Sequence, residues 1–144
     1  MYDTIVVGTD GSPSAAIAVQ HAASLAAATG AHLHVAMAEP SIPMMVAPDM
    51  VVATAEWGTA TDQATRAALE SAAEIAAAAG VEATTHQVTG DPADALLSLC
   101  DDVKADLLVV GSRGMHGARR FLLGSVSSRC AHHAHRSILI VHTD

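Results

Sequence analysis

The strongest constraint on the fold is a regular alternation between short β-branched apolar runs and longer alanine-rich stretches. The short runs predict strands and the longer stretches predict helices. The predicted strands cover residues 4–7, 32–37, 81–88, 106–110 and 137–141, and the predicted helices cover residues 13–29, 55–79, 92–103 and 125–135. This order predicts a single-domain α/β fold: an open, parallel, five-stranded sheet with helices on both faces. A closed barrel is excluded because it needs more strand–helix units.

Residues with strong conformational preferences mark the helix ends. Ser12-Pro13 combines a favoured N-cap with a favoured first helical residue, and Gly30 is placed to end that helix. Asp91-Pro92 supplies a second start of the same kind. These signals predict two well-bounded helices, each following a strand.

Polarity along the strands indicates their places in the sheet. The mixed polarity of 81–88 predicts a strand near an edge, and the continuous apolar run of 106–110 predicts burial on both faces. If the closing strand, 137–141, also lies at an edge, its backbone groups need a cover.

The chain has the length and composition of one domain, residues 1–144, with 51% apolar residues. Residues 39–52 contain Pro40, Pro43 and Pro48 and predict a long loop, either a mobile lid or an ordinary connection. The two cysteines do not form a disulfide framework, and no apolar run reaches the length of a membrane span. We therefore expect a cytoplasmic protein.

Charge is unevenly distributed along the sequence. The formal net charge is −8, which argues against nucleic acid and anionic membranes as partners. Residues 107–143, however, contain five arginines and no acidic residue. The sequence thus predicts that any basic surface comes from this last quarter.

A glycine-punctuated loop follows the fourth predicted strand. Gly111, Gly114 and Gly117 let backbone N–H groups approach a ligand, and Gly124-Ser125 begins a helix whose N-terminus favours an anion. Phosphate binding is one interpretation, and an ordinary turn leading into a Ser-capped helix is the other. The loop is neither a Walker A motif, which needs a lysine before the hydroxyl residue, nor a GxGxxG dinucleotide motif.

These residues resemble a known family. Gly111-x2-Gly114-x9-Gly124-Ser125 matches the G-2x-G-9x-G-[S/T] signature of ATP-binding universal stress proteins, and TIVVGTDGSPSA is similar to the start of that family. The resemblance covers the whole chain except 39–58, a segment in which the family varies in length and which we expect to be a flexible loop. It implies a universal stress protein fold that binds ATP, ADP or AMP, with or without Mg²⁺.

The resemblance also implies which residues bind the nucleotide. The positions that match the family's site are Gly8, Thr9, Asp10, Val35, Gly111, Arg113, Gly114, His116, Gly117, Gly124, Ser125, Val126 and Ser127. Asp10 would lie near the adenosine and the Val35 backbone near the adenine. One departure is Arg136, which stands where many members have a proline. The family further implies a homodimer through the last strand, at Ser137, Ile138, Leu139, Ile140 and Val141.

Other functions receive less support from the residues. Asp10 lacks the acidic neighbours of a phosphoacceptor site, and a turn or cap role stays open for it. Cys130, His132, His133 and His135 do not all share one helix face, so no metal site is predicted, and a helix-dipole role explains the histidines. No general base stands out. We therefore expect a regulatory stress-response module with slow or no ATP hydrolysis, the alternative being an interaction protein that binds no nucleotide and works by dimerisation.

Overall fold

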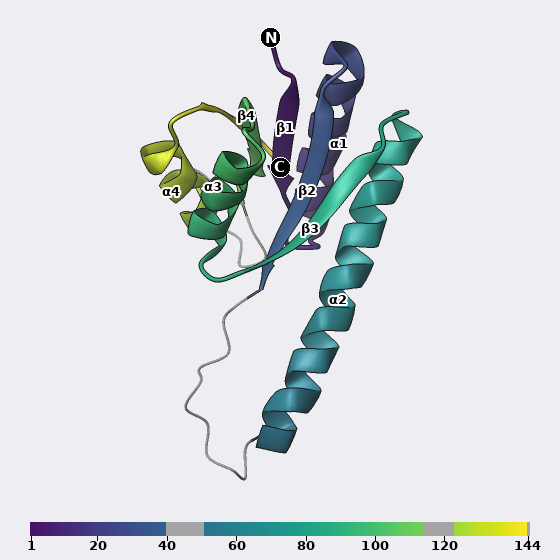
Figure 1. The fold of residues 1–144 in the computed structure, drawn as a ribbon, viewed down its shortest axis with the longest axis vertical. Coiled ribbons are helices and arrows are strands. Elements are labelled where there is room, and N and C mark those ends of the chain that lie inside the picture. The colour runs from purple at the N-terminus through teal and green to yellow at the C-terminus, as the bar shows by residue number, and fades with distance from the viewer. Residues whose placement is uncertain (40–50, 114–122, 144) are drawn as a thin grey trace.

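The structure, a computed structural model, describes residues 1–39, 51–113 and 123–143, and for residues 51–61 it describes the backbone alone. Strands and helices alternate along the chain (Figure 1). The strands are β1 (Thr4–Gly8), β2 (His32–Glu39), β3 (Ala83–Thr89), β4 (Leu107–Gly111) and β5 (Ser137–Val141), and the helices are α1 (Pro13–Thr29), α2 (Val51–Ala78), α3 (Pro92–Asp102) and α4 (Ser125–His133). The α/β fold predicted from the alternation is confirmed.

The five strands form one parallel sheet in the order β3-β2-β1-β4-β5. β1 is the central strand, β2 and β4 lie on either side of it, and β3 and β5 form the two edges. β3 consists of exposed and half-buried residues with none fully buried, as its mixed polarity predicts for an edge strand. β4 is buried from Leu107 to Val110, which confirms the prediction that both of its faces are covered.

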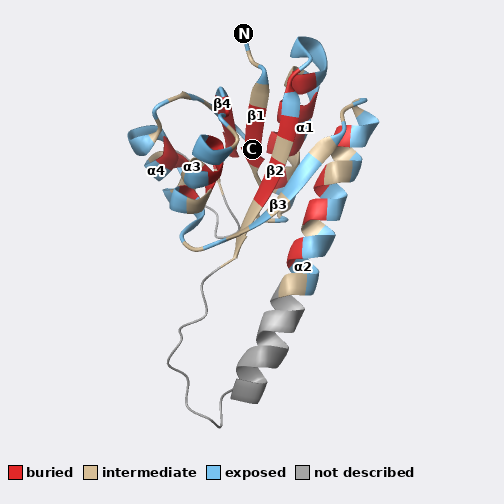
Figure 2. Ribbon diagram, in the orientation of Figure 1, coloured by how far each residue is buried: buried red, intermediate tan, exposed pale blue. Residues whose placement is uncertain are grey.

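The helices cover the sheet in two layers. α1 and α2 pack on one face, and the shorter α3 and α4 pack on the other (Figure 1). Successive residues of β1 point to opposite faces of the sheet. Ile5 and Val7 belong to the core cluster under α1 and α2, and Val6 belongs to the core cluster under α3 and α4. Figure 2 shows the buried residues on the strands and on the inner sides of the helices. None of the described helices is both long and apolar enough to cross a membrane.

The predicted helix starts are confirmed by their hydrogen bonds. The Ser12 Oγ accepts a hydrogen bond from the Ala15 N–H over 3.1 Å, and Gly30 ends α1 with a left-handed φ of 76°. The Asp91 carboxylate accepts one from the Asp94 N–H, also over 3.1 Å. Local sequence therefore bounds α1 and the start of α3.

The predicted loop over 39–58 is wrong at both of its described ends. Glu39 is the last residue of β2, and α2 begins at Val51, so residues 51–58 are helical. The last proline of the segment is Pro48, and the single Gly58 costs a helix only about 1 kcal/mol relative to alanine. Residues 40–50 lie outside the described part of the chain.

β3 begins two residues later than predicted. The Val81 N–H donates a hydrogen bond to the Ala76 carbonyl over 3.0 Å, and Gly80 has a φ of 80°. These bonds close the end of α2, so Val81 belongs to the helix terminus and the strand starts at Ala83.

Arg136 has a structural role at the position where the related family often has proline. Its Nη1 donates to the Cys100 carbonyl over 2.9 Å and to the Ala105 carbonyl over 2.8 Å, and its Nη2 pairs with the Asp101 carboxylate. The guanidinium thus satisfies carbonyls at and just beyond the end of α3, which a proline side chain could not do. The departure from the family pattern is therefore compensated in this chain.

Candidate functional site

The carboxyl ends of β1 and β4 lie side by side at the centre of the sheet. From this pair the sheet extends in opposite directions, to β2 and β3 on one side and to β5 on the other. Open α/β sheets bind ligands at such a point of reversal. The structure brings three groups of described site residues to this end of the sheet: Gly8 to Asp10 at the end of β1, Gly111 and Arg113 at the end of β4, and Gly124 to Ser127 at the start of α4.

The turn after β1 is fixed by its own hydrogen bonds. The Thr9 N–H donates to the Ala36 carbonyl of β2 over 2.9 Å, and the Asp10 Oδ1 accepts from the Ser12 N–H over 2.9 Å. Asp10 thus has the turn role that the sequence left open. The same bond holds its carboxylate at the carboxyl end of β1.

Two of the predicted site glycines lie in close contact with other parts of the protein. A Cβ atom on Gly8 would lie 2.7 Å from Leu96 Cδ1 of α3. A Cβ atom on Gly111 would lie 3.3 Å from the Arg113 carbonyl oxygen. Glycine at these positions therefore allows α3 to pack on β1 and the chain to turn closely after β4, whatever else these residues do.

Val35 lies inside the sheet rather than at its edge. It is level with Val7 of β1 and Thr85 of β3, and its side chain is fully buried under α1 and α2. β2 continues for four residues beyond it, to Glu39. The structure places the Val35 side chain in the core, and contact between its backbone and a nucleotide stays a prediction from the family resemblance.

The two ends of the loop after β4 are joined to each other. The Gly124 N–H donates to the Ser112 carbonyl over 2.8 Å, and the Ser112 N–H donates to the Val141 carbonyl over 2.8 Å. These bonds anchor the start of α4 to the ends of β4 and β5. Gly114, His116 and Gly117 lie between the joined ends and outside the described residues.

The N-terminus of α4 carries no side-chain cap among the described residues. Its N-cap is Gly124, and Ser125 is exposed. Val126 is half-buried against the core, and Ser127 is buried, with its hydroxyl donating to the Gly124 carbonyl over 3.0 Å and lying 3.4 Å from the Ser112 carbonyl. Because the Ser127 proton is used within the protein, the backbone N–H groups and the Ser125 hydroxyl are the donors that α4 offers to an anion.

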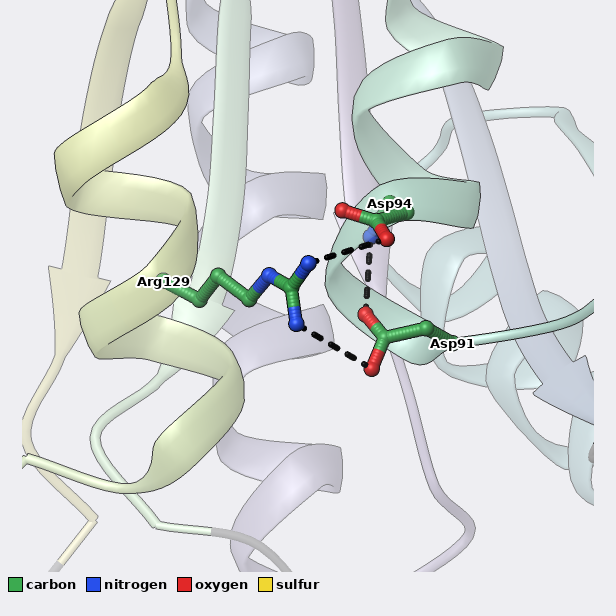
Figure 3. Close-up of polar contacts among 3 residues, drawn as sticks. All are labelled: Asp91, Asp94 and Arg129. Carbon is green, nitrogen blue, oxygen red and sulfur yellow. Dashed lines mark hydrogen bonds and ion pairs between the residues drawn. The ribbon is translucent and has the colours of Figure 1, made fainter.

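Residues 107–143 contain no acidic residue, but in the structure two of their arginines pair with aspartates from other segments. Arg129 of α4 lies between Asp91 and Asp94 of α3, with Nη1 3.7 Å from Asp91 Oδ2 and Nη2 3.1 Å from Asp94 Oδ2 (Figure 3). Arg136 is likewise paired, with Asp101. The prediction of a basic surface from the last quarter is therefore wrong for these two arginines, because acids distant in sequence neutralise them.

Three polar residues near the same edge were missed from the sequence. Ser112 is buried and accepts the bond that closes the loop. Glu39 Oε1 and Thr143 Oγ1 are buried and have no hydrogen-bond partner among the described residues. Ser112 could have been suspected from its place inside the glycine motif, but no local signal reveals the burial of Glu39 and Thr143.

The two cysteines are unsuited to nucleophilic chemistry. Cys100 and Cys130 are free and buried, and burial raises the pKa of both thiols to about 11. Within the described residues, no group of three or more His, Cys, Asp or Glu side chains is placed to hold a metal ion. His132 and His133 occupy the last turn of α4, where cationic side chains interact favourably with the helix dipole.

Comparison with known proteins identifies similar sequences along the whole chain. A family model described as the universal stress protein family matches residues 1–142. A universal stress protein of Mycobacterium tuberculosis is 38% identical over 143 residues, which cover 99% of this chain and 97% of that protein.

Solved structures give the same result at the level of the fold. A universal stress protein crystallised in complex with cAMP is 40% identical, with a TM-score of 0.75 over 99% of this chain and 98% of the other. The universal stress protein UspA from Lactobacillus plantarum is 21% identical, with a TM-score of 0.86 over 97% of each chain. This second likeness concerns the fold alone.

Proposed function

This chain belongs to the universal stress protein family, and on that basis we propose that it binds an adenine nucleotide at the carboxyl ends of β1 and β4. In this proposal the phosphates lie at the start of α4 and the nucleoside lies toward β1 and β2. The binding residues are those that match the family's site: Gly8, Thr9, Asp10, Val35, Gly111, Arg113, Gly114, His116, Gly117, Gly124, Ser125, Val126 and Ser127.

The observation that carries the proposal is the start of α4. Its N-terminus lacks a side-chain cap among the described residues, it is anchored by the Gly124–Ser112 hydrogen bond, and it lies at the point of reversal of the sheet. An uncapped helix N-terminus offers N–H donors and a positive dipole end to a phosphate. The relative crystallised with cAMP supports an adenine nucleotide as the ligand class.

We place the function in binding and regulation, with slow or no hydrolysis of ATP. Phosphoryl-transfer enzymes position a base or an oriented water beside the reacting phosphate. At this site the Asp10 carboxylate, on the nucleoside side, already accepts a hydrogen bond from the Ser12 N–H. The cytoplasmic location is part of the same proposal, and the two free, buried cysteines fit it.

The experiment is to denature the purified protein and identify any released nucleotide by chromatography. Calorimetric titrations with ATP, ADP, AMP and cAMP follow, with and without Mg²⁺, and GTP is the control for base selectivity. We expect an adenine nucleotide to be released, bound on titration, or both. Absence of bound nucleotide together with no binding of any of the four would overturn the proposal and favour the interaction protein that binds no nucleotide.

The edge strand β5 supports a homodimer as the second part of this proposal. Its Leu139 is 36% exposed, and an unpaired edge with an exposed apolar residue favours association with a second strand. Leu139→Lys is expected to shift the protein to a monomer in sedimentation experiments, with Thr84→Lys, an exposed position on the opposite edge strand β3, as the matched control. A wild-type protein that sediments as a monomer at micromolar concentration would contradict this part.

A further inference from the structure

His34 and His86 face each other across two neighbouring strands. The His34 Nδ1 lies 2.8 Å from the His86 Nε2, and the ring centroids are 5.0 Å apart with the planes tilted by 34°. The residues are distant in sequence and meet because β2 and β3 pair in parallel, with Ala36 level with His86. The contact belongs to no part of the nucleotide site proposed above.

The pair lies on the sheet face that carries α3 and α4, beside the edge of the sheet. Ala36, the level partner of His86, belongs to the core cluster under α3 and α4, and His34 precedes it by two residues on the same face. Both histidines are half-buried, and β3 has no further strand outside it. The pairing of β2 with β3 therefore fixes the positions of the two residues, and both side chains are partly accessible to solvent.

Both imidazoles are held in the neutral form. Burial lowers the pKa of His34 and of His86, and the neighbouring His86 and His32 lower the pKa of His34 further. A neutral imidazole has one ring nitrogen with a free lone pair, which is the form that ligates metals. In the hydrogen bond seen here a single proton lies between the two facing nitrogens.

We propose that His34 Nδ1 and His86 Nε2 form a site for a divalent transition-metal ion of the Cu²⁺ and Ni²⁺ class. The ion takes the place of the proton between the two rings, and the ring that held this proton carries it on its other nitrogen instead, so both imidazoles stay neutral and each gives the metal one lone pair. Imidazole nitrogen is a preferred ligand for these ions, and Cu²⁺ binds most tightly among the first-row divalent metals. The remaining coordination positions are filled by water, because the described residues provide no third ligand at this place.

The separation of the nitrogens suits a tetragonal ion better than a tetrahedral one. Two imidazole nitrogens at about 2.0 Å from a metal and at right angles are about 2.8 Å apart, whereas at a tetrahedral angle they are about 3.3 Å apart. The observed 2.8 Å equals the separation of the first arrangement. To bind the ion, each ring has to turn from its hydrogen-bonding orientation so that its lone pair points at the metal, and both rings lie half-buried beside the edge strand β3.

The test uses the full chain without an affinity tag, titrated with Ni²⁺ alone and with Cu²⁺ alone at neutral pH. We expect one site per chain that is lost in His34→Gln and His86→Gln, each with at least a tenfold drop in affinity, since even outer-shell changes at metal sites cost about 10–100-fold. Binding should weaken below the ordinary pKa of histidine, because protons compete for the same lone pairs. His132→Gln/His133→Gln, which removes two exposed histidines of α4, is the matched control and should retain the site.

A second measurement does not depend on the variants folding. Substoichiometric Cu²⁺ added to the wild-type protein should broaden NMR signals of β2 and β3 around His34 and His86 before those of α4. Broadening centred on α4, equal affinity in wild type and both single variants, or no binding to the wild-type protein would each overturn the proposal.

Discussion

α3 and α4 lie on the same face of the sheet, and both start beyond the carboxyl ends of the strands, but their N-termini differ in capping and charge. α3 is capped by the Asp91 side chain and has Asp94 in its first turn, and both carboxylates are paired with Arg129 (Figure 3). α4 has no acidic residue in its first turn, and no side chain among the described residues caps it. A helix N-terminus whose N–H groups are bonded by a side chain of the same protein has a structural role. An N-terminus whose N–H groups have no such acceptor favours the binding of an anion.

The largest effect is expected from giving α4 the acidic first turn that α3 has. Ser125→Glu should weaken nucleotide binding about tenfold or more, because two like charges about 4 Å apart at a protein surface repel by roughly 1–4 kcal/mol. The fold should be unharmed, since an acid near a helix N-terminus interacts favourably with the dipole.

Calorimetry for binding and thermal melts for stability measure the two effects, with the uncharged Ser125→Gln as the matched control. If the Glu and Gln variants bind nucleotide equally well, the phosphates do not lie at the start of α4.

A smaller effect is expected from removing the cap of α3. Asp91→Ala should lower the free energy of unfolding by about 1 kcal/mol, because the Asp94 N–H loses its acceptor. This corresponds to a melting temperature lower by roughly 2–4 °C for a chain of this size. Asp91→Asn retains a capping oxygen and should keep most of the stability, so equal losses in both variants would show that charge rather than capping matters here.

The smallest effect is expected at the bridge between the two helices. Arg129 and its two partners are each about half exposed, so Arg129→Gln should lower the free energy of unfolding by less than about 1 kcal/mol, and the loss should shrink at high salt. Denaturant unfolding of a double-mutant cycle with Asp94→Asn measures the coupling. A coupling that does not change with salt would mean that the contact is not chiefly electrostatic.

The fold was predictable because its signals are local. Ser12-Pro13, Gly30 and Asp91-Pro92 fix helix ends through bonds to residues within one turn, and the apolar runs mark the buried strands. The start of α2 was misplaced because prolines up to Pro48 suggested a loop, and nothing in the following residues marks a helix start as strongly as a capped proline does.

The site was only partly predictable, because much of it depends on contacts between distant segments. The glycine motif located the start of α4, and the family resemblance located Asp10. The pairing of Arg129 with α3 and the hydrogen bond of Gly124 to Ser112 arise from the packed structure. A count of charges along the sequence cannot anticipate which of them meet in space.

The Gly124–Ser112 hydrogen bond has a consequence for redesign of the loop that it closes. Hydrogen bonds join Ser112 to Gly124 and to Val141 at the end of β5, so the two ends of the loop are held at fixed positions. The entropic cost of closing the loop therefore depends mainly on its length. Doubling the length of such a loop costs only about 0.6 kcal/mol. The fold of this protein should therefore tolerate changes in the length of the segment between residues 113 and 123, even where such changes abolish nucleotide binding.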